Sequence, residues 1–463
     1  MIEKSEIDTK SEELGVHVSH VQRDYVFGWL LASLFESTNP LRDTLILKGG
    51  NCFRKAYFER ARYSNDLDFS TEVPLEVTLL LDGLKLACQS AARRSGVEFL
   101  VEDSRVSEVS FADQETRMYD ARVYFKSFYG EEDFRLRVSM DVKEYDRIFL
   151  PVQARSLIHA YSDQGECSAT IRCFKLEELL ASKLKALLQR RHSPDLYDFV
   201  HAIFFQKVLD ISRLEILTTF LKMTIYEPDP VVAKNLLLRL PFQVIRGLWK
   251  EYLVCPKMSD FSFEDAEQWF KSAIAEMFGL LEPRYAIAEA TGWSERRYYY
   301  PAEFRDSIIE AGRLKRVIRF VYDSLERRVE PYALCFKRRR DGVAREYFYG
   351  WDQTGGRSGE IGIKSYTADK VQAVEITEDS FEPRFPIELT KAGQYFGRPF
   401  FTGSPGPRTS TTRSPRSWYG MEYRVECPYC GKTFKRAGFG DTKLNDHKDQ
   451  YGNRCYGRVG HMI

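Results

Sequence analysis

A glycine pair followed by two aspartates, all within residues 47–69, constrains the fold and chemistry of this chain more than any other feature. An apolar run ends at Gly49 and Gly50, which predicts a strand that leads into a turn. Because glycine has no Cβ, a triphosphate can approach the N–H groups of such a turn. Asp66 and Asp68 are two residues apart in an extended segment, so their carboxylates face the same side and can bind one Mg²⁺ or Mn²⁺. The stretch therefore predicts a site for a metal ion and a nucleotide.

Each of these motifs is common on its own in turns and solvated loops, so the combination carries the argument. In order, spacing and flanking residues, the stretch resembles the AbiEii/AbiGii family of nucleotidyltransferase toxins, the group that includes the MenT toxins. The family motif is a Gly-Gly or Gly-Ser pair, a helix and then Arg-x-Ser-x-Asp-Leu-Asp, which corresponds here to residues 62–68. The resemblance implies an α/β nucleotidyltransferase core with a mixed sheet and helices, in which Asp66 and Asp68 are catalytic metal ligands. The residues that it implies for nucleotide binding are Lys48, Gly49, Gly50, Asn51, Arg62 and Ser64.

A third carboxylate is predicted from the segment over 135–142. Its period-two alternation places Val138, Met140 and Val142 on one face and Asp141 on the other, polar face. Polymerase-like nucleotidyltransferases need a third carboxylate on a neighbouring strand, as a metal ligand or as the base for the attacking hydroxyl. We therefore predict that Asp141 completes the catalytic set. An ordinary half-exposed strand position is the alternative.

A helix over 174–191 is predicted from the 3.6-residue spacing of its leucines, and Lys183 lies within its apolar stripe. Such a lysine usually packs its stem and extends its ammonium group to water. The family carries a lysine at the matching place of its Leu-x-x-x-Lys-Leu-x-Ala-Leu helix. The resemblance therefore implies that Lys183 is a catalytic residue that contacts the phosphates of the nucleotide.

The residues after this helix predict the start of another one, since Ser193 can cap it, Pro194 suits its first turn and Asp195 favours its positive end. The family has an Arg-Asp-x-x-Asp element here that is thought to complete the active site. This chain matches both aspartates, Asp195 and Asp198, but has Pro194 where the family has a basic residue. We predict Asp195 as a catalytic residue and Asp198 as part of the nucleotide-binding site.

The 463 residues are enough for several domains. Alternating strands and helices predict a nucleotidyltransferase core over 1–210, followed by a helical extension over 211–300. Short aromatic strands and a Gly355-Gly356 turn then predict a small β-rich domain over 303–392. Its strands are expected at 317–322, 329–334, 346–351 and 371–376.

The β-rich region loosely resembles a WYL domain. Residues 316–322 overlap the first family element, residues 346–348 replace the Trp-Tyr-Leu element, and Lys364 stands where the family has an arginine. WYL domains are associated with the sensing of ligands or nucleic acids in bacterial defence systems. The resemblance thus implies a domain that gates the enzyme, and a purely structural β domain is the alternative.

The C-terminal part of the chain predicts a metal site. Residues 393–420 are rich in Gly, Pro, Ser and Thr, which predicts a flexible linker to a zinc finger over 421–463. The finger has a Cys-x-x-Cys knuckle and few aliphatic residues, so Zn²⁺ would supply the stability that a core cannot. The pattern is similar to small zinc ribbons of actinobacterial and phage proteins. The predicted zinc ligands are Cys427, Cys430, His447 and Cys455, with His461 as a competitor for the fourth position.

The net charge of +1 hides a basic tail, in which residues 408–463 carry eleven Lys and Arg against five acidic residues. This excess predicts contact with nucleic-acid phosphates, and protein binding is the alternative. No run of 18 apolar residues occurs, so we expect a cytoplasmic protein without membrane contact. The nine cysteines are expected as reduced thiols or metal ligands.

Together the motifs predict an enzyme that moves a nucleotide from an NTP to an acceptor. The resemblance implies the 3′ end of a tRNA as the acceptor, a role as a toxin or phage-defence effector, and a separate antitoxin or partner protein. Two alternatives remain open. One is the synthesis of an oligonucleotide signal or the nucleotidylation of a protein, and the other is a non-catalytic regulator that binds nucleic acid.

Overall fold

The computed structural model divides the chain into two compact units, Met1–Ala392 and Gly393–Ile463. We describe each unit separately. The described residues are 2–113, 116–128, 135–205, 209–281, 298–338 and 343–390 of the first unit, and 423–427, 432–436, 443–445, 447–448, 454–455 and 461–462 of the second.

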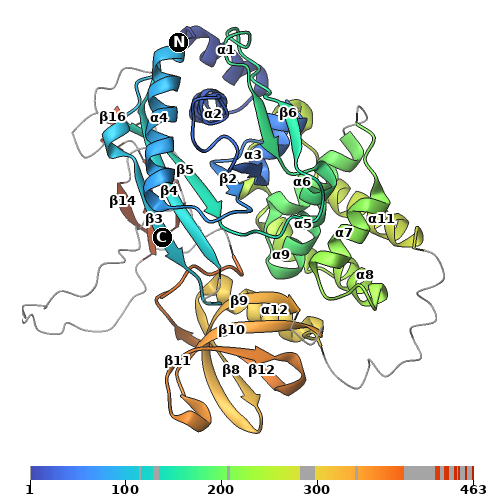
Figure 1. Ribbon diagram of the computed structural model, residues 1–463. Helices are drawn as coiled ribbons and strands as arrows, with labels where there is room; N and C mark the ends of the chain where they lie inside the picture. Colours follow the sequence, from blue (N-terminus) through green and yellow to red (C-terminus); the bar gives the residue numbers. More distant parts are fainter. Residues whose placement is uncertain are drawn as a thin grey trace, which may run out of the picture. The chain divides into compact units, whose positions relative to one another are not determined.

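The first unit contains a seven-stranded sheet with the order β3-β4-β5-β2-β1-β7-β6 (Figure 1). β2 runs antiparallel to β1 and parallel to β5, and β1 runs parallel to β7, so the sheet is mixed as predicted. The strands are β1 (Ile46–Lys48), β2 (Asp66–Ser70), β3 (Arg105–Ser110), β4 (Arg117–Lys126), β5 (Arg135–Lys143), β6 (Gln153–Ser156) and β7 (Thr170–Cys173).

One face of this sheet is apolar and covered by helices. The alternation predicted for β5 is confirmed, since Val138, Met140 and Val142 are all buried. Helix α4 (Val77–Ser95) packs against β3 and β4, and α2 (Val18–Leu34) packs against α4. Every residue of α2 from Asp24 to Leu34 is buried, and most of this stretch is apolar. The N-terminal helix α1 (Lys4–Leu14) packs against α2.

Helices follow the sheet in the chain, as predicted. The predicted helical extension is interrupted between Leu238 and Phe242, because Pro241 cannot continue the backbone hydrogen-bond pattern of a helix. The helices are α5 (Leu176–Gln189), α6 (Ser193–Val200), α7 (Arg213–Met223), α8 (Pro230–Leu238), α9 (Phe242–Gly247), α10 (Trp249–Tyr252) and α11 (Phe263–Gly279).

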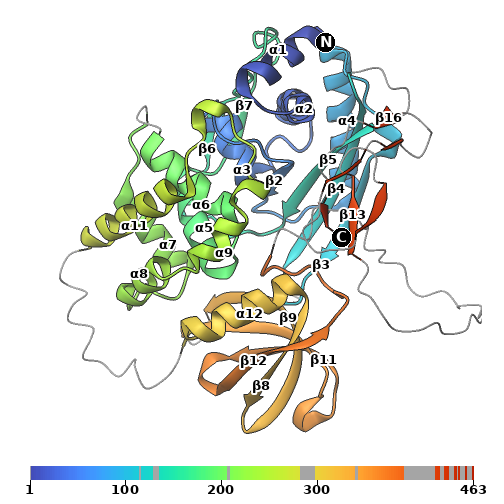
Figure 2. The same cartoon turned by 180° about the vertical axis from the view of Figure 1, so that it is seen from behind.

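A second, five-stranded sheet has the order β11-β10-β9-β8-β12, with every neighbouring pair antiparallel (Figure 2). All four expected strands are present. The strand β11 was not predicted, because its alternation is weak. The helix α12, which packs on this sheet, was not predicted either. These elements are α12 (Ala302–Leu314), β8 (Arg316–Tyr322), β9 (Leu325–Arg338), β10 (Ala344–Asp352), β11 (Gly362–Thr367) and β12 (Val371–Ser380).

The two sheets of the first unit are joined by packed side chains. Phe336 of β9 packs against the core of the first sheet, and Ala112, between β3 and β4, belongs to the core of the second. Arg305 of α12 is 1% exposed and donates to the hydroxyl of Tyr226 at 2.8 Å and to the carbonyl of Leu188 in α5 at 3.5 Å. The second sheet therefore contacts the helix that carries Lys183.

The second unit has a small core. Its sheets have the order β14-β13-β17 and the pair β15-β16. The predicted linker over 393–420 lies outside the described residues. Among the residues that the structure describes in either unit, no helix has the length and apolar character needed to cross a lipid bilayer. The strands are β13 (Tyr423–Glu426), β14 (Thr433–Arg436), β15 (His447–Lys448), β16 (Arg454–Cys455) and β17 (His461–Met462).

Candidate active site

Three carboxylates converge on two neighbouring strands. β2 carries Asp66 and Asp68, and Asp68 is in register with Asp141 on the parallel strand β5. Carboxylate oxygens of the three residues lie within 4.8 Å of one another. The structure thus brings together the three carboxylates that the sequence analysis singled out, on the face opposite the apolar one. Hard oxygen ligands at this spacing fit Mg²⁺ or Mn²⁺.

The glycine pair lies directly against these carboxylates. Helix α3 (Gly49–Cys52) begins at the glycine pair, so the predicted turn is wrong and the strand β1 passes straight into a helix. Gly49 has φ of +70°, and a Cβ there would lie 1.9 Å from Oδ2 of Asp68. A Cβ on Gly50 would lie 2.7 Å from Nη2 of Arg62. Both positions therefore require glycine, because any side chain would displace the groups that form the site.

Asn51 and Ser64 hold the first aspartate in place. The hydroxyl of Ser64 donates to Oδ1 of Asp66 at 2.7 Å. The amide of Asn51 donates to the backbone carbonyl of Asp66. These hydrogen bonds fix the start of β2 and the orientation of its first carboxylate, which a metal ligand needs.

Buried ion pairs connect the remaining predicted residues. Arg62 donates to both carboxylate oxygens of Asp198, at 2.7 and 2.9 Å. Lys183 lies 2.8 Å from Asp198 and 3.0 Å from Asp195. Arg190 completes the chain of contacts through a 2.7 Å bond to Asp195. We call these five residues the ion-pair network. Lys183 therefore does not extend to water, as an ordinary lysine in an apolar stripe would.

The ion-pair network keeps its charges. Burial by itself raises the pKa of Asp198, but Arg62 and Lys183 outweigh this effect and hold that pKa below the ordinary aspartate value. Burial lowers the pKa of Lys183, yet Asp198 and Asp195 raise it above the ordinary lysine value. Three cations face two carboxylates, so the network has an excess of one positive charge. This excess suits an anionic ligand such as a triphosphate.

The basic partner missing at Pro194 comes from elsewhere in the sequence. Arg190, five residues before Asp195, supplies the cation. Helix α6 begins at Ser193, but Ser193 is not its capping residue; its hydroxyl donates to the carbonyl of Leu248 instead. The predicted cap is therefore wrong. The pairing of Arg190 with Asp195 could have been predicted from the sequence only by considering basic residues at other distances along the chain from Asp195.

Lys48 has a partner that the sequence did not indicate. It is in register with Asp68 across β1 and β2, and its ammonium group lies 2.6 Å from Asp146. Asp146 also pairs with Lys143 at 3.1 Å and accepts a hydrogen bond from Ser70 at 2.9 Å. Despite burial, which acts in the opposite direction, the two lysines lower the pKa of Asp146. Lys48 is thus held beside the carboxylates by a salt bridge.

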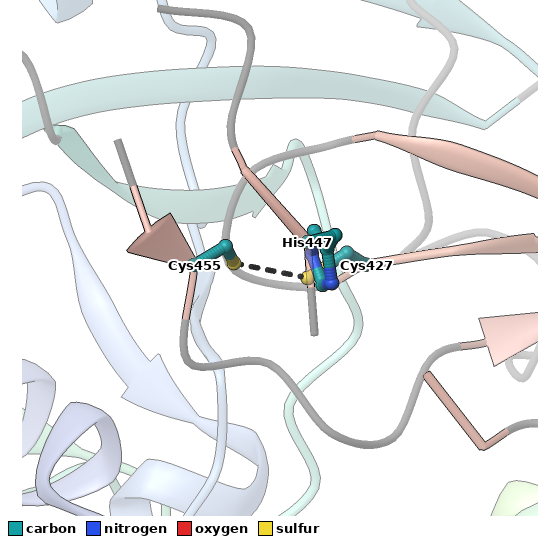
Figure 3. A group of neighbouring side chains, drawn as sticks. All are labelled: Cys427, His447 and Cys455. Carbon is teal, nitrogen blue, oxygen red and sulfur yellow. Dashed lines mark hydrogen bonds between the residues drawn. The ribbon is translucent and has the colours of Figure 1, made fainter. Parts of the chain in front are cut away.

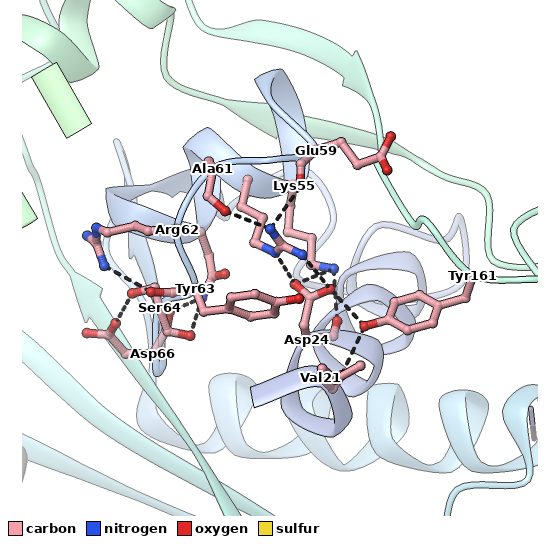
Figure 4. Close-up of polar contacts among 12 residues, drawn as sticks. Val21, Asp24, Lys55, Glu59, Ala61, Arg62, Tyr63, Ser64, Asp66 and Tyr161 are labelled. Atoms are coloured by element: carbon pink, nitrogen blue, oxygen red, sulfur yellow. Dashed lines mark hydrogen bonds and ion pairs between the residues drawn. The ribbon is translucent and has the colours of Figure 1, made fainter. Parts of the chain in front are cut away.

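A second buried network supports the loop before Arg62 (Figure 4). Asp24 of α2 pairs with Arg54 at 2.7 Å and with Lys55 at 2.9 Å, both on a π-helical turn after α3. Arg54 donates in addition to the carbonyls of Glu59 and Ala61. No local pattern in the sequence indicates this network. It links α2 to the loop that positions Arg62 and Ser64.

A different cluster of possible metal ligands lies in the second unit (Figure 3). Ligand atoms of Cys427, His447 and Cys455 lie within 4.8 Å of one another, and the two sulfurs are 3.6 Å apart. Two thiolates on one tetrahedral Zn²⁺ are separated by about 3.8 Å when each Zn–S bond is ~2.3 Å. Nδ1 of His447 donates to the carbonyl of Asn445 at 2.8 Å, which orients its ring. The predicted ligand Cys430 lies outside the described residues, as does the side chain of His461.

Comparisons with known proteins add the following findings. Residues 30–253 match the family described as nucleotidyl transferase AbiEii toxin of type IV toxin–antitoxin systems. The nucleotidyltransferase toxin MenT4 of Mycobacterium tuberculosis H37Rv is similar in structure, with a TM-score of 0.41 and 19% identity over 63% of this chain and 95% of that chain. JHP933 from Helicobacter pylori has a TM-score of 0.37 and 15% identity over 59% of this chain and 97% of that one. Comparison with curated proteins gives no match.

The family match includes the glycine pair, the three carboxylates and the whole ion-pair network. Residues 30–253 of this chain therefore match the AbiEii toxin family, and the protein is a nucleotidyltransferase.

Proposed function

We propose that the protein transfers a nucleotide from an NTP to the 3′ end of a tRNA in a reaction that depends on Mg²⁺ or Mn²⁺. One observation carries this proposal: carboxylate oxygens of Asp66, Asp68 and Asp141 lie within 4.8 Å of one another on two adjacent strands. Clustered acidic groups repel one another unless a cation is shared between them. Their donor set fits the metal that nucleotidyl transfer needs.

Each carboxylate has a role in this proposal. Asp66 and Asp68 hold the metal ion, and Asp141 binds the metal or accepts the proton of the acceptor hydroxyl. The metal, when bound, neutralises negative charge on the triphosphate. The hydroxyl oxygen forms a bond to the α-phosphorus, the bond from that phosphorus to the bridging oxygen breaks, and pyrophosphate leaves with the bonding electrons.

The ion-pair network and the glycine pair form the nucleotide side of the site. Lys183 and Arg62 contact the phosphates, and Asp195 and Asp198 hold both cations in position. Gly49 keeps the backbone close to the carboxylate of Asp68. We include Lys48, Asn51 and Ser64 in the nucleotide site because Lys48 is paired with Asp68 across the strands and the other two donate hydrogen bonds to Asp66. Gly50 is included because it lies against Arg62 and Ser64. Positioning and charge neutralisation then supply most of the catalysis.

The family suggests a biological role. AbiEii proteins are described as toxins of type IV toxin–antitoxin systems, so we propose growth arrest through blocked tRNA and control by an antitoxin. The five-stranded sheet with α12 would serve as a WYL-like sensing domain. The cluster of Cys427, His447 and Cys455, together with Cys430, would bind Zn²⁺ and present a basic finger to RNA phosphates.

A labelling experiment tests the proposal. The protein is incubated with each NTP labelled at its α-phosphate, with Mg²⁺ and with or without total tRNA, and the products are separated on a denaturing gel. We expect the label on tRNA with the intact protein and none with Asp66→Ala/Asp68→Ala. Asp82→Ala removes an exposed carboxylate from α4 and should leave transfer unchanged. Label in short oligonucleotides or on the protein would reject tRNA as the acceptor. Undiminished transfer by Asp66→Ala/Asp68→Ala would reject the proposed site.

A further inference from the structure

The catalytic carboxylates belong to a longer row of side chains on the polar face of the first sheet. Strand register aligns Lys48, Asp68, Asp141 and Asp120 across β1, β2, β5 and β4. In the next row, Asp66 is followed by Ser139, Arg122 and Arg105 on β5, β4 and β3. Arg137 and Tyr124 form the row after that. Residues paired in this way point to the same face of a sheet.

The character of this face changes sharply beyond the carboxylates. On the opposite face, Ala121, Val123 and Val138 are fully buried. On the polar face Arg105 is exposed, and Arg122, Tyr124, Arg137 and Ser139 are half-buried. Strands with one polar face are ordinary in antiparallel sheets, but three arginines and a tyrosine beside a catalytic centre form a specific surface. We call Arg105, Arg122, Tyr124 and Arg137 the arginine face.

The order of strands indicates on which side of the carboxylates the nucleotide and the acceptor would lie. The glycine pair follows β1, and Lys183 lies in α5, which follows β7. The proposed nucleotide phosphates therefore lie on the β1 side of the carboxylates. In nucleotidyl transfer the attacking and leaving oxygens are roughly in line across the phosphorus. The acceptor hydroxyl must then approach from the opposite side, which is formed by β5, β4 and β3.

The side chains there have the chemistry of a nucleic-acid surface. Arginines bind phosphate oxygens, and a tyrosine ring provides a stacking platform for a base. Arg122 is oriented by its neighbour, since its Nε donates to Asp120 at 3.1 Å. Neighbouring strands are ~4.8 Å apart, so the three strands span about 10 Å. That width suits one strand of nucleic acid.

We propose that the arginine face binds the single-stranded 3′ end of the RNA acceptor and leads its terminal hydroxyl to Asp141. The proposal rests on the proposed function and deepens it. Arg105 and Arg137 contact phosphates, Tyr124 stacks on a base, and Asp120 orients Arg122 toward the strand.

Binding without catalysis tests the proposal. A fluorescein-labelled single-stranded RNA is titrated with the protein, and anisotropy gives the dissociation constant at several salt concentrations. We expect Arg105→Glu and Arg137→Glu each to weaken binding by about tenfold and to reduce the slope of log affinity against log salt by ~0.7. Arg93→Glu makes the same charge change at an exposed position on α4 and should leave binding unchanged.

A second pair of variants examines the tyrosine. Tyr124→Phe keeps a ring and should keep RNA binding, whereas Tyr124→Ala should weaken it by about tenfold. Each variant is also titrated with a non-hydrolysable NTP and Mn²⁺, whose affinity should equal that of the unaltered protein. An unchanged NTP affinity shows that the fold and the carboxylate site are intact.

These readouts separate the two proposals. If the protein binds RNA through the arginine face but does not transfer nucleotides to tRNA, the proposed function is wrong, whereas the arginine face remains an RNA-binding surface. If Arg105→Glu, Arg137→Glu and Arg93→Glu all bind RNA with the affinity of the unaltered protein, the arginine face is not the acceptor surface, whatever the enzyme transfers. Weaker binding in Arg93→Glu by the same factor would also overturn the proposal, because the effect would then reflect total charge.

Discussion

Among the described residues, two clusters of three side chains could hold a metal ion, and their surroundings differ greatly. Asp66, Asp68 and Asp141 lie on adjacent strands of a seven-stranded sheet with a large apolar core. Cys427 and Cys455, with His447, lie in a unit where the aliphatic residues Val425 and Leu444 are buried. Both clusters have ligand atoms within the same 4.8 Å limit. Similar ligand spacing therefore occurs beside a large apolar core in the first unit and beside a small one among the described residues of the second.

Because the surrounding cores differ in size, a metal ion would have a different effect in each cluster. The sheet fixes the carboxylates through strand register, so a metal there adds chemistry and little folding energy. In the second unit, each of the described elements is short and the ligands themselves are part of the core. A metal there would supply folding free energy directly.

Removal of zinc should unfold the second unit. We expect a chelator or Cys455→Ser to cost this unit about 10 kcal/mol, the free energy that a structural zinc supplies at neutral pH. Hydrogen exchange of the full chain should show loss of protection after residue 423 and unchanged protection in the first sheet. Cys255→Ser, which alters a half-buried thiol outside the cluster, is the control. Protection that survives complete metal removal would contradict the contrast.

Loss of the carboxylates should reduce activity and leave the fold of the first unit intact. In Asp66→Ala/Asp68→Ala we expect nucleotidyl transfer to fall by about a thousandfold or more, because charge on the triphosphate is no longer neutralised. Thermal unfolding of the first unit should be little changed or shift upward, since mutual repulsion of the acids is relieved. Rates from the labelling assay and the melting temperature measure the two effects. A large drop in melting temperature would mean that the carboxylates also maintain the fold.

Disruption of the ion-pair network should affect both properties. Asp198→Asn leaves Arg62 and Lys183 buried with less compensation, so we expect a loss of roughly 3 kcal/mol in the free energy of unfolding. Transfer should also fall, because both cations lose their positions. Urea denaturation measures the stability, with Asp82→Asn on the surface as the control. Equal stability of the two variants would show that the network serves the ligand alone.

Acid should weaken the first unit through the same residues. Arg190 and Lys183 hold the pKa of Asp195 well below its ordinary value in spite of burial, and Asp198 behaves likewise. The stability that they contribute is complete above about pH 4 and is lost as the pH falls through the lowered values. Each such group adds a slope of up to ~1.4 kcal/mol per pH unit. Urea denaturation between pH 2 and pH 7 should show this decline, and the slope should be smaller in Asp198→Asn.

Local patterns predicted much of the fold. The alternation of Val138, Met140 and Val142 gave both the strand β5 and the face on which Asp141 lies. Leucine spacing predicted α5, and aromatic runs predicted four of the five strands in the second sheet. The helix at Gly49 was not predicted, because glycine has a low helix propensity and usually marks a turn. Glycine is nevertheless required at position 49, because a side chain there would meet the carboxylate of Asp68.

The chemical character of the site can be predicted from the sequence, because residue types and short spacings are local properties. The predicted residues include the three carboxylates, Lys183 and the Cys and His residues that could hold a metal ion. Only the tertiary structure decided which charges meet, since partners such as Arg190 and Asp195, Lys48 and Asp146, or Asp24 and Arg54 depend on how distant segments pack. Strand order likewise placed Asp120 and the arginine face beside Asp141. Long-range register follows from the packing of the whole sheet, which no short stretch of sequence specifies.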